Sequence, residues 1–445
     1  MVQTLLVLSI VLGLHTKQVN YTLAFCQAPI DTDVYKRQEW CNPLTLTMKA
    51  NAEDNPRWND AMNGPNAEGF WRAMEDELTQ LGAKFVWEEV SRDKADKILP
   101  STWTYKVKRF PDGSVRKLKA RFCARGDCQI EGADFFDTYA PVVSWTTVRT
   151  LLVLSIFLGL HTKQVDYTLA FCQAPIDTNV YVEMPRGFRK PGKVLKLKQS
   201  LYGLKQSPKN FFHHLRDNLI ACGFVQSQYD ACLFTSDDVI ILVYVDDCLL
   251  YAPNADSIDK AIEKIRSKGM DVHFEDDVAG FLGVHINRRD DGTIELTQTG
   301  LIDRIIDALG LDGATPKKTP AECGALGSDK EGDPCNADFN YASVVGMMMY
   351  LCSNTRPNIT FAVHQCAQFS HRARYSHELA LKRIGRYLIG TRTKGLIFNA
   401  SNSLNIDMFV DADFAGLWGV EDPNEPASIK SRTGFVIRIG GCPSL

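Results

Sequence analysis

The spacing of apolar residues along the chain predicts a mixture of helices and strands. After Asn66, which is placed to cap a helix, Phe70, Met74 and Leu81 recur at helical spacing. Similar spacing predicts further helices at 257–268, 301–309, 341–353 and 377–389. Apolar and β-branched runs predict strands at 102–107, 115–124, 239–245, 248–252, 406–410 and 434–439. Together these elements predict an α+β fold.

One stretch of the chain occurs twice. Residues 4–35 recur at 150–181 with substitutions at three pairs of positions, Val11/Phe157, Asn20/Asp166 and Asp33/Asn179. A solenoid needs at least three such units, and the likeness ends after Tyr35, as expected for a fragment joined upstream by rearrangement or by an assembly error. We therefore interpret residues 1–38 as a misplaced duplicate. The apolar part of the internal copy is expected to form a buried helix rather than a signal peptide or a membrane span.

The composition is typical of a globular protein. Of the 445 residues, 45% are hydrophobic and 23% are charged, which excludes the disordered, collagen-like and disulfide-scaffold classes. The length predicts about three domains. The 13 cysteines include no Cys-x-x-Cys pair and no zinc-finger spacing, so reduced thiols in an intracellular, cytoplasmic location are expected.

Positive charge is concentrated in two segments, although the formal net charge is only −3. Eight Lys or Arg residues and one acid lie between Trp103 and Gly126, on two predicted strands joined by the turn 111–113. The segment 186–216 has nine basic residues, no acid and several aromatic residues. Such segments suit a nucleic-acid backbone. A solvated charged surface explains either segment equally well when it is taken alone.

Asp246 and Asp247 are adjacent, between two predicted strands. Two neighbouring carboxylates repel each other unless a positive charge lies close by. Mg²⁺ binds through one or two protein carboxylates together with substrate phosphates, so the pair indicates a phosphate-bearing substrate. The alternative is an ordinary turn, because Asp is common in turns.

The residues around this acidic pair resemble a known family. Tyr244-Val245-Asp246-Asp247 after an apolar strand resembles the active-site hairpin of reverse transcriptases. Further blocks narrow the resemblance to copia-type retrotransposon polymerases: Trp103-Thr104-Tyr105-Lys106, Leu118-Lys119-Ala120-Arg121, Thr138-Tyr139-Ala140-Pro141, Ser200-Leu201-Tyr202-Gly203-Leu204-Lys205, Phe281-Leu282-Gly283 and Thr355-Arg356-Pro357. The resemblance covers nearly all of 56–445 and implies a right-hand polymerase with fingers, a palm built on an antiparallel sheet, and a thumb.

The resemblance also implies a catalytic trio of carboxylates. Gln164-Val165-Asp166 with Ala170-Phe171 is similar to the family's context for a third carboxylate. It implies that Asp166 and Asp246 bridge two Mg²⁺ ions, for which Mn²⁺ can substitute, with Asp247 as a weaker or more distant ligand. The upstream copy has Asn20 at the matching position and lacks this charge. Without the family context, Asp166 is a surface residue beside a strand.

Other matched positions imply roles in binding. Arg121, and with less support from the motif Lys108 or Arg109, resemble residues that grip the triphosphate of the incoming nucleotide. Phe171 matches an aromatic residue that crowds a ribose 2′-hydroxyl, with core packing as the alternative. Tyr202 and Gly203 match a segment that borders the nucleotide pocket. Phe281, Leu282 and Gly283 resemble a turn that positions the primer.

The domain boundaries follow from the resemblance and from loop composition. We expect the duplicate at 1–38, the polymerase fingers, palm and thumb at 39–311, a linker at 312–338, connection helices at 339–400 and a truncated, incomplete ribonuclease H-like domain at 401–445. Asp411 resembles the first carboxylate of that last domain. The later carboxylates are missing before Leu445, so ribonuclease H activity is expected to be absent.

Two functions from different classes remain open. The first is an RNA-directed DNA polymerase that adds deoxynucleoside triphosphates to a primer on an RNA template, without a membrane partner. The second is a catalytically silent, rearranged retroelement remnant that at most binds nucleic acid. The intact acidic trio favours the first, and the duplication at 1–38 favours the second.

Overall fold

The structure is a computed structural model of the chain. It describes residues 54–109, 115–274, 281–335, 338–399, 405–413, 431 and 433–443. The duplicate at 1–38 and the predicted turn at 111–113 lie outside the described residues. The contacts divide the described chain into two units: a sheet unit, residues 54–144 and 160–274, and a helical unit, residues 145–159 and 281 onward.

The sheet unit contains four α-helices and eleven strands among its described residues. The α-helices are α3 (Trp58–Asn63), α4 (Ala67–Ala83), α6 (Ser207–Ala221) and α7 (Ala255–Ser267). The strands are β1 (Trp87–Ser91), β2 (Ser101–Arg109), β3 (Val115–Ala124), β4 (His161–Tyr167), β5 (Tyr181–Glu183), β6 (Lys193–Leu197), β7 (Val225–Gln226), β8 (Leu233–Thr235), β9 (Ile240–Tyr244), β10 (Asp247–Ala252) and β11 (Val272–Phe274). Three short 3₁₀ turns complete the unit: η2 (Arg92–Lys94), η3 (Gly126–Cys128) and η4 (Ala170–Gln173).

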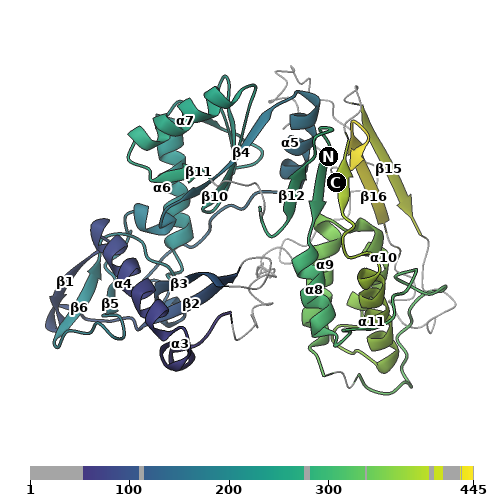
Figure 1. The fold of residues 1–445 in the computed structure, drawn as a ribbon, viewed down its shortest axis with the longest axis horizontal. Coiled ribbons are helices and arrows are strands. Elements are labelled where there is room, and N and C mark those ends of the chain that lie inside the picture. The colour runs from purple at the N-terminus through teal and green to yellow at the C-terminus, as the bar shows by residue number, and fades with distance from the viewer. Residues whose placement is uncertain are drawn as a thin grey trace. The chain divides into compact units, whose positions relative to one another are not determined.

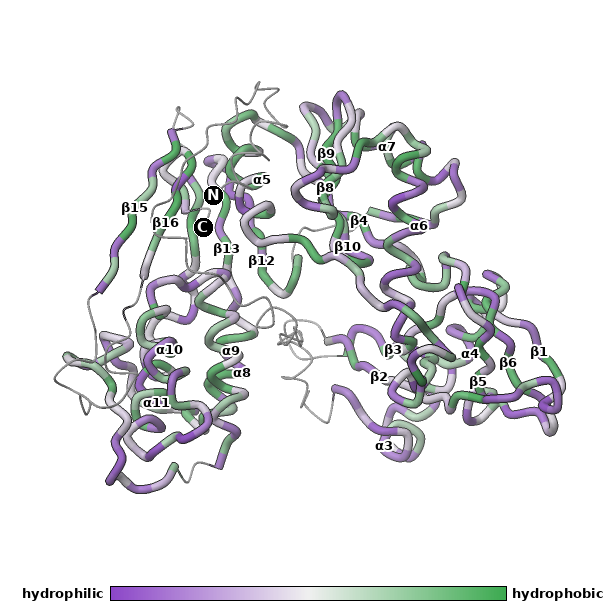
Figure 2. The backbone as a smooth tube through the Cα atoms, turned by 180° about the vertical axis from the view of Figure 1, so that it is seen from behind, coloured by the Kyte–Doolittle hydropathy of each residue, from purple (hydrophilic) through white to green (hydrophobic). Residues whose placement is uncertain are grey.

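A six-stranded antiparallel sheet with the order β11-β4-β10-β9-β8-β7 forms the larger part of this unit (Figure 1). The hydrophobic residues along β8 and β9 can be followed in Figure 2, and most of them are buried. Helix α7 packs against β10 and β4, and its residues Ile258, Ile262 and Ile265 are all buried. The predicted strands on either side of Asp246 and the predicted helix at 257–268 are confirmed.

The hairpin of β2 and β3 packs against α4. Phe70, Met74 and Leu81 of α4 are buried, as their helical spacing predicts, and they share one hydrophobic core with Trp103 and Phe122 of the hairpin. Asn66 is the residue that precedes α4, but its side chain makes no capping hydrogen bond. The two strands therefore have one apolar face toward α4 and leave their other face to polar residues.

The helical unit begins with α5 (Trp145–Phe157), in which nine residues are buried, so the buried helix predicted for the internal copy of the repeat is confirmed. Its other described elements are β12 (His285–Arg288), β13 (Ile294–Thr297), α8 (Thr299–Ala308), α9 (Tyr341–Asn354), η5 (Pro357–Ile359), α10 (Thr360–Ala367), α11 (Tyr375–Ile389), β14 (Leu396–Phe398), β15 (Ile406–Ala412), β16 (Thr433–Ile439) and β17 (Cys442–Pro443). The predicted helices and strands of this region are confirmed, with ends that differ by at most two residues.

The segment predicted as a linker, 312–338, contains neither a helix nor a strand among its described residues. It does not separate the two units, because α8 before it and α9, α10 and α11 after it share one hydrophobic core. Periodicity along the chain marks elements but does not encode which of them pack together. Within the part of the chain that the structure describes, no helix combines the length and the apolar character of a membrane span.

Candidate active site

Asp246 lies in the two-residue turn between β9 and β10, and Asp247 begins β10. In the antiparallel register, Asp247 is directly opposite Tyr244 on β9 and directly opposite Asp166 on β4. His273 on β11 is opposite Asp166 on its other side. Residues directly opposite each other in an antiparallel pair point to the same face of the sheet. Four strands therefore place Tyr244, Asp247, Asp166 and His273 in one row, which we call the acidic row after its two aspartates, although those aspartates are far apart in the sequence.

The turn that carries Asp246 has a strained backbone. Val245 has a φ of +51°, in the left-handed region that is unusual for a β-branched residue. Such conformations cost about 1–3 kcal/mol and occur most often at functional sites. The strain is the consequence of a turn of only two residues, and it holds Asp246 beside the row of acidic residues.

The aspartates have polar neighbours from the same sheet. Nε2 of Gln164 donates to Oδ1 of Asp247 over 3.5 Å, and Nε2 of His273 lies 3.9 Å from Oδ2 of Asp166. The side chain of Asp166 is 33% exposed, so an incoming ligand can reach it. Burial raises the pKa of the Tyr244 hydroxyl, and the charges of Asp246 and Asp247 raise it further. Tyr244 is consequently a neutral hydrogen-bonding group in this site at ordinary pH.

The acidic row offers two carboxylates to a divalent cation. Asp166 and Asp247 present hard oxygen ligands on one face of the sheet. Two carboxylates lie within the one or two that Mg²⁺ commonly takes from a protein. Among the described residues, no group of three or more His, Cys, Asp or Glu side chains is arranged to hold a metal ion. The bridging role predicted for Asp246 stays a prediction, and the register gives the position across from Asp166 to Asp247.

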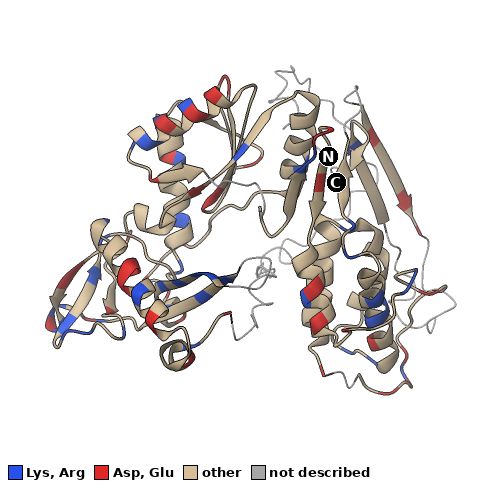
Figure 3. Cartoon of the chain, in the orientation of Figure 1, with Lys and Arg blue, Asp and Glu red and all other residues tan. Residues whose placement is uncertain are grey.

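A cationic face lies on the β2–β3 hairpin, and we define it by five residues. The register pairs Thr104 with Arg121, Lys106 with Lys119, and Lys108 with Lys117, so all these side chains share the face opposite the apolar one. The members of the cationic face are Lys106, Lys108, Lys117, Lys119 and Arg121. Figure 3 shows the Lys and Arg residues along both strands. Like charges directly opposite each other destabilise a sheet, so this face favours an anionic ligand.

The cationic face and the acidic row influence each other electrostatically. Burial lowers the pKa of Lys119, the charges of Arg121 and Lys108 lower it further, and the charges of Glu77 and Asp166 oppose the shift. Lys119 was not among the predicted site residues, although it stands in the Leu118–Arg121 block that carried the resemblance. Lys108 is exposed on the cationic face, and the side chain of Arg109 lies outside the described residues.

Arg121, Tyr202 and Phe171 form one contact cluster. The guanidinium of Arg121 lies over the ring of Tyr202, 4.8 Å from its centroid, and the rings of Tyr202 and Phe171 are 5.0 Å apart. Burial raises the pKa of Tyr202, and Asp246 is among the charges that act on it. The ring centroids of Phe171 and of Phe211 on α6 are 6.2 Å apart, and Phe171 packs against the hydrophobic core. The core-packing alternative for Phe171 and the nucleotide-pocket prediction are therefore compatible.

Gly203 allows two backbone segments to approach closely. Its φ is +89°, and a Cβ at this position would lie 2.2 Å from the carbonyl oxygen of Ala124, at the end of β3. The amide of Ala124 donates to the carbonyl of Tyr202 over 2.8 Å. Only glycine fits this contact, which fixes Tyr202 next to the end of the cationic hairpin.

The predicted primer-positioning turn lies in the helical unit. Leu282 and Gly283 both have positive φ, the amide of Val284 donates to the carbonyl of Phe281, and Phe281 is fully buried. The hydroxyl of Tyr350 on α9 donates to the carbonyl of Leu282 over 2.6 Å. These contacts make a tight turn that α9 holds in place, and its role with a primer stays a prediction. Asp411 is exposed on β15, where its carboxylate accepts from the amide of Ala412.

Sequence reasoning missed two buried or paired groups at this site. Glu77 of α4 is buried, accepts from the amide of Phe122 over 3.3 Å, and has a pKa raised by burial. His273 is on a three-residue strand that has no periodic signal of its own. For Glu77 a signal was present, because it lies three residues after Met74 and four before Leu81, on the apolar face of the predicted helix.

The sheet unit thus combines an antiparallel sheet that pairs two aspartates with a strongly cationic hairpin. A family model described as reverse transcriptase (RNA-dependent DNA polymerase) matches residues 84–323, which is more than half of the chain. The chain belongs to this reverse transcriptase family. The predicted resemblance to copia-type retrotransposon polymerases is confirmed by the relatives below.

Plant transposons provide similar curated proteins. The retrovirus-related Pol polyprotein from transposon RE1 of Arabidopsis thaliana is 31% identical over 411 residues, covering 90% of this chain and 27% of the relative. The corresponding polyprotein from transposon TNT 1-94 of Nicotiana tabacum is 30% identical over 398 residues, covering 86% of this chain and 29% of the relative. The chain thus spans less than a third of the length of these relatives.

Among solved structures, a foamy viral protease-reverse transcriptase in complex with double-stranded DNA is similar, with 14% sequence identity and a TM-score of 0.42. The similarity covers 84% of this chain and 54% of that one.

Proposed function

We propose that this chain is an RNA-directed DNA polymerase that adds deoxynucleotides to the 3′-hydroxyl of a primer paired to an RNA template. The observation that carries the proposal is the direct cross-strand pairing of Asp166 with Asp247, next to Asp246 in its strained turn. The cationic face of the β2–β3 hairpin supports it by offering five positive charges to phosphate groups.

Asp166, Asp246 and Asp247 would hold two Mg²⁺ ions, or Mn²⁺ in their place. When bound, the ions supply charge that activates the primer hydroxyl and stabilises the departing pyrophosphate. The protein positions the carboxylates through strand pairing, so their geometry is set before any nucleotide arrives. Gln164 orients the carboxylate of Asp247 through its amide.

The remaining site residues would bind and select the nucleotide. Arg121 offers a planar fork that suits phosphate oxygens, and its contact with Tyr202 limits the positions it can take. Phe171 is held between Tyr202 and Phe211, so its ring has little freedom to make room for a 2′-hydroxyl. Pairing with the template would select the base, while the cationic face would contact the backbone without reading sequence.

Primer extension on an RNA template with Mg²⁺ tests this proposal with the full chain. Asp166→Asn and Asp247→Asn should each lower the rate by at least about a hundredfold, because each loses one negative charge at the metal position. Asp246→Asn tests whether Asp246 or Asp247 shares the metal ions with Asp166. A loss of rate comparable to that of Asp166→Asn supports the bridging role of Asp246. Asp411→Asn is the matched control, an aspartate on an exposed strand of the other unit, and should extend the primer normally.

Extension that survives both Asp166→Asn and Asp247→Asn would remove the catalytic assignment. A wild-type protein that binds the primer–template but does not extend it supports the alternative of a silent remnant. Binding alone does not separate the two functions, because both predict affinity that falls with salt.

A further inference from the structure

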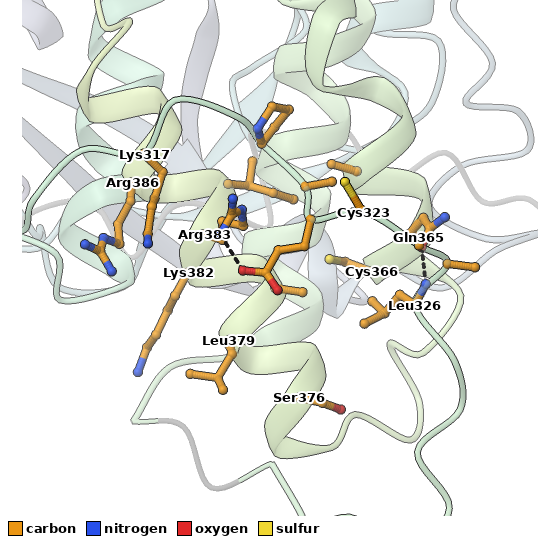
Figure 4. Close-up of a pocket in the computed structure, with 18 of the residues that line it drawn as sticks. Lys317, Cys323, Leu326, Gln365, Cys366, Ser376, Leu379, Lys382, Arg383 and Arg386 are labelled. Atoms are coloured by element: carbon orange, nitrogen blue, oxygen red, sulfur yellow. Dashed lines mark hydrogen bonds and ion pairs between the residues drawn. The ribbon is translucent and has the colours of Figure 1, made fainter. Parts of the chain in front are cut away.

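A cavity of about 760 Å³ lies in the helical unit, between helices α10 and α11 and the segment 311–326 (Figure 4). This volume is in the range of small-molecule sites. The segment that forms one wall is the beginning of the stretch whose composition predicted only a linker. Hydrogen bonds fasten it to the helices: Nε of Arg386 donates to the carbonyl of Thr315 over 2.6 Å, and the amide of Leu326 donates to Oε1 of Gln365 over 2.5 Å.

The walls of the cavity are mostly apolar. They include Leu326 from the segment, Ala362 from α10, and Leu379, Ala380 and Ile384 from α11. Small alanine side chains on both helices leave room for a flat group between them. An apolar wall of this kind binds the body of a ligand but does not select its charge.

The charge of the lining is strongly positive. Lys317, Lys382, Arg383 and Arg386 line the cavity, and Glu322 is the single acid that does so among the described residues. Figure 4 shows these four cations on one side of the cavity. Lys382 and Arg383 pair with Glu378 at 2.7 Å and Glu322 at 2.5 Å. Lys317, which is exposed, and Arg386, which is half-buried, line the cavity and have no ion pair with any described acid, so both charges are available to a ligand.

Two buried donors in the lining have no acceptor. Nε2 of Gln365 and Nε of Arg383 are both buried without a hydrogen-bond partner within the described structure. Gln365 is only 5% exposed, and the Leu326 amide fixes which end of its side chain is the donor. A buried donor without an acceptor costs about 1–3 kcal/mol. Neither nitrogen is accessible in this structure, so an acceptor oxygen on a bound ligand removes that cost only when the side chain turns toward it.

We propose that this cavity binds an organic anion, with an acidic group at the cationic side, an apolar body against α10 and α11, and an acceptor oxygen toward which the Gln365 amide turns. This binding site is separate from the proposed polymerase chemistry. An inorganic anion would make no use of the apolar walls, and a neutral ligand would make no use of the charges of Lys317 and Arg386. The three features of the cavity are satisfied together only by a molecule that has all three parts.

Three related naphthalenes test the proposal by fluorescence titration of the full chain. The complete probe is 6-methoxy-2-naphthylacetate. The second, the carboxylate 2-naphthaleneacetate, lacks the methoxy oxygen that serves as the acceptor. The third, 2-methoxynaphthalene, lacks the acid. We expect the third to bind at least about tenfold more weakly than the first, which corresponds to 1.4 kcal/mol, and the second about threefold more weakly. Equal affinity for the three compounds overturns the proposal, as does displacement of the complete probe by an equal concentration of inorganic phosphate.

Protein variants locate the site. Lys317→Glu should weaken the complete probe about tenfold, whereas Lys318→Glu, a neighbouring exposed lysine that does not line the cavity, should change it less than about twofold. In Gln365→Leu the difference between the first two probes should disappear. The bound probe should also slow the alkylation of Cys323, which lines the cavity, but not that of Cys128, which is exposed in the sheet unit. The same response from Lys317→Glu and Lys318→Glu, or no protection of Cys323, overturns the assignment.

Discussion

The close approach of Gly203 to the end of β3 leads to a prediction that can be worked out quantitatively. Gly203→Ala would place a methyl group 2.2 Å from the carbonyl oxygen of Ala124 while the backbone has a φ of +89°. The obstacle is main chain rather than a flexible side chain, so it cannot rotate away. Either the 200–206 segment or the end of β3 must move, and Tyr202 would move with it.

Two costs and one gain determine the size of the effect. A left-handed backbone costs an alanine about 1–2 kcal/mol, and overpacking typically costs about 1–3 kcal/mol. The restricted unfolded chain returns about 0.4–1 kcal/mol. We expect Gly203→Ala to destabilise the protein by about 2–4 kcal/mol. Gly269→Ala is the matched control, because Gly269 has a φ of +90° and no atom within 4 Å of the position that a Cβ would occupy, and it should cost about 1 kcal/mol.

Urea unfolding of both variants, followed by far-ultraviolet circular dichroism, measures the difference. The displacement of Tyr202 should in addition raise the KM for deoxynucleotides in Gly203→Ala but not in Gly269→Ala. Equal free energies of unfolding for the two variants would refute the reasoning, because the backbone conformations match and only the contact with Ala124 differs.

Three further predictions concern buried groups. Burial raises the pKa of Glu77 above its ordinary 4.5, so the folded protein holds this proton to higher pH than the unfolded chain, and the stability contribution of the group falls as pH rises through that window. Glu77→Gln should flatten this fall when urea midpoints are compared at about pH 5 and about pH 8; a slope as steep as in wild type contradicts it. Arg356 is buried and donates to the carbonyl and hydroxyl of Thr391 through both terminal nitrogens of its guanidinium. Arg356→Lys has a single terminal nitrogen and should lower the free energy of unfolding in urea by about 2–4 kcal/mol. A loss below about 0.5 kcal/mol would show that these two hydrogen bonds do not stabilise the fold. Burial raises the pKa of Cys366 to about 11, so iodoacetamide should alkylate exposed Cys323 at least about tenfold faster, measured by mass spectrometry of the two peptides, and similar rates would argue against the burial of Cys366.

Much of the local structure could be predicted from the sequence. The helical spacing of Phe70, Met74 and Leu81 predicted α4, and the apolar run before Asp246 predicted the β9–β10 hairpin. The concentration of lysine and arginine in the β2–β3 hairpin could also be read from the sequence. Every second residue of a strand lies on the same face, and these two strands are adjacent in the chain. These features depend on neighbours in the chain, and the sequence states those neighbours directly.

The tertiary structure alone decided which distant elements meet. The family resemblance implied that Asp166 lies near Asp246 and Asp247, but it did not give the register. That Asp166 stands directly opposite Asp247 depends on how the whole sheet packs, because strands separated by some eighty residues have no local signal for their alignment. The same reason explains why the predicted linker became a wall of a cavity, and why the donor of Gln365 was left without an acceptor. Local periodicity determined the elements, whereas burial and the pairing of remote backbone groups determined the chemistry that those elements bring together.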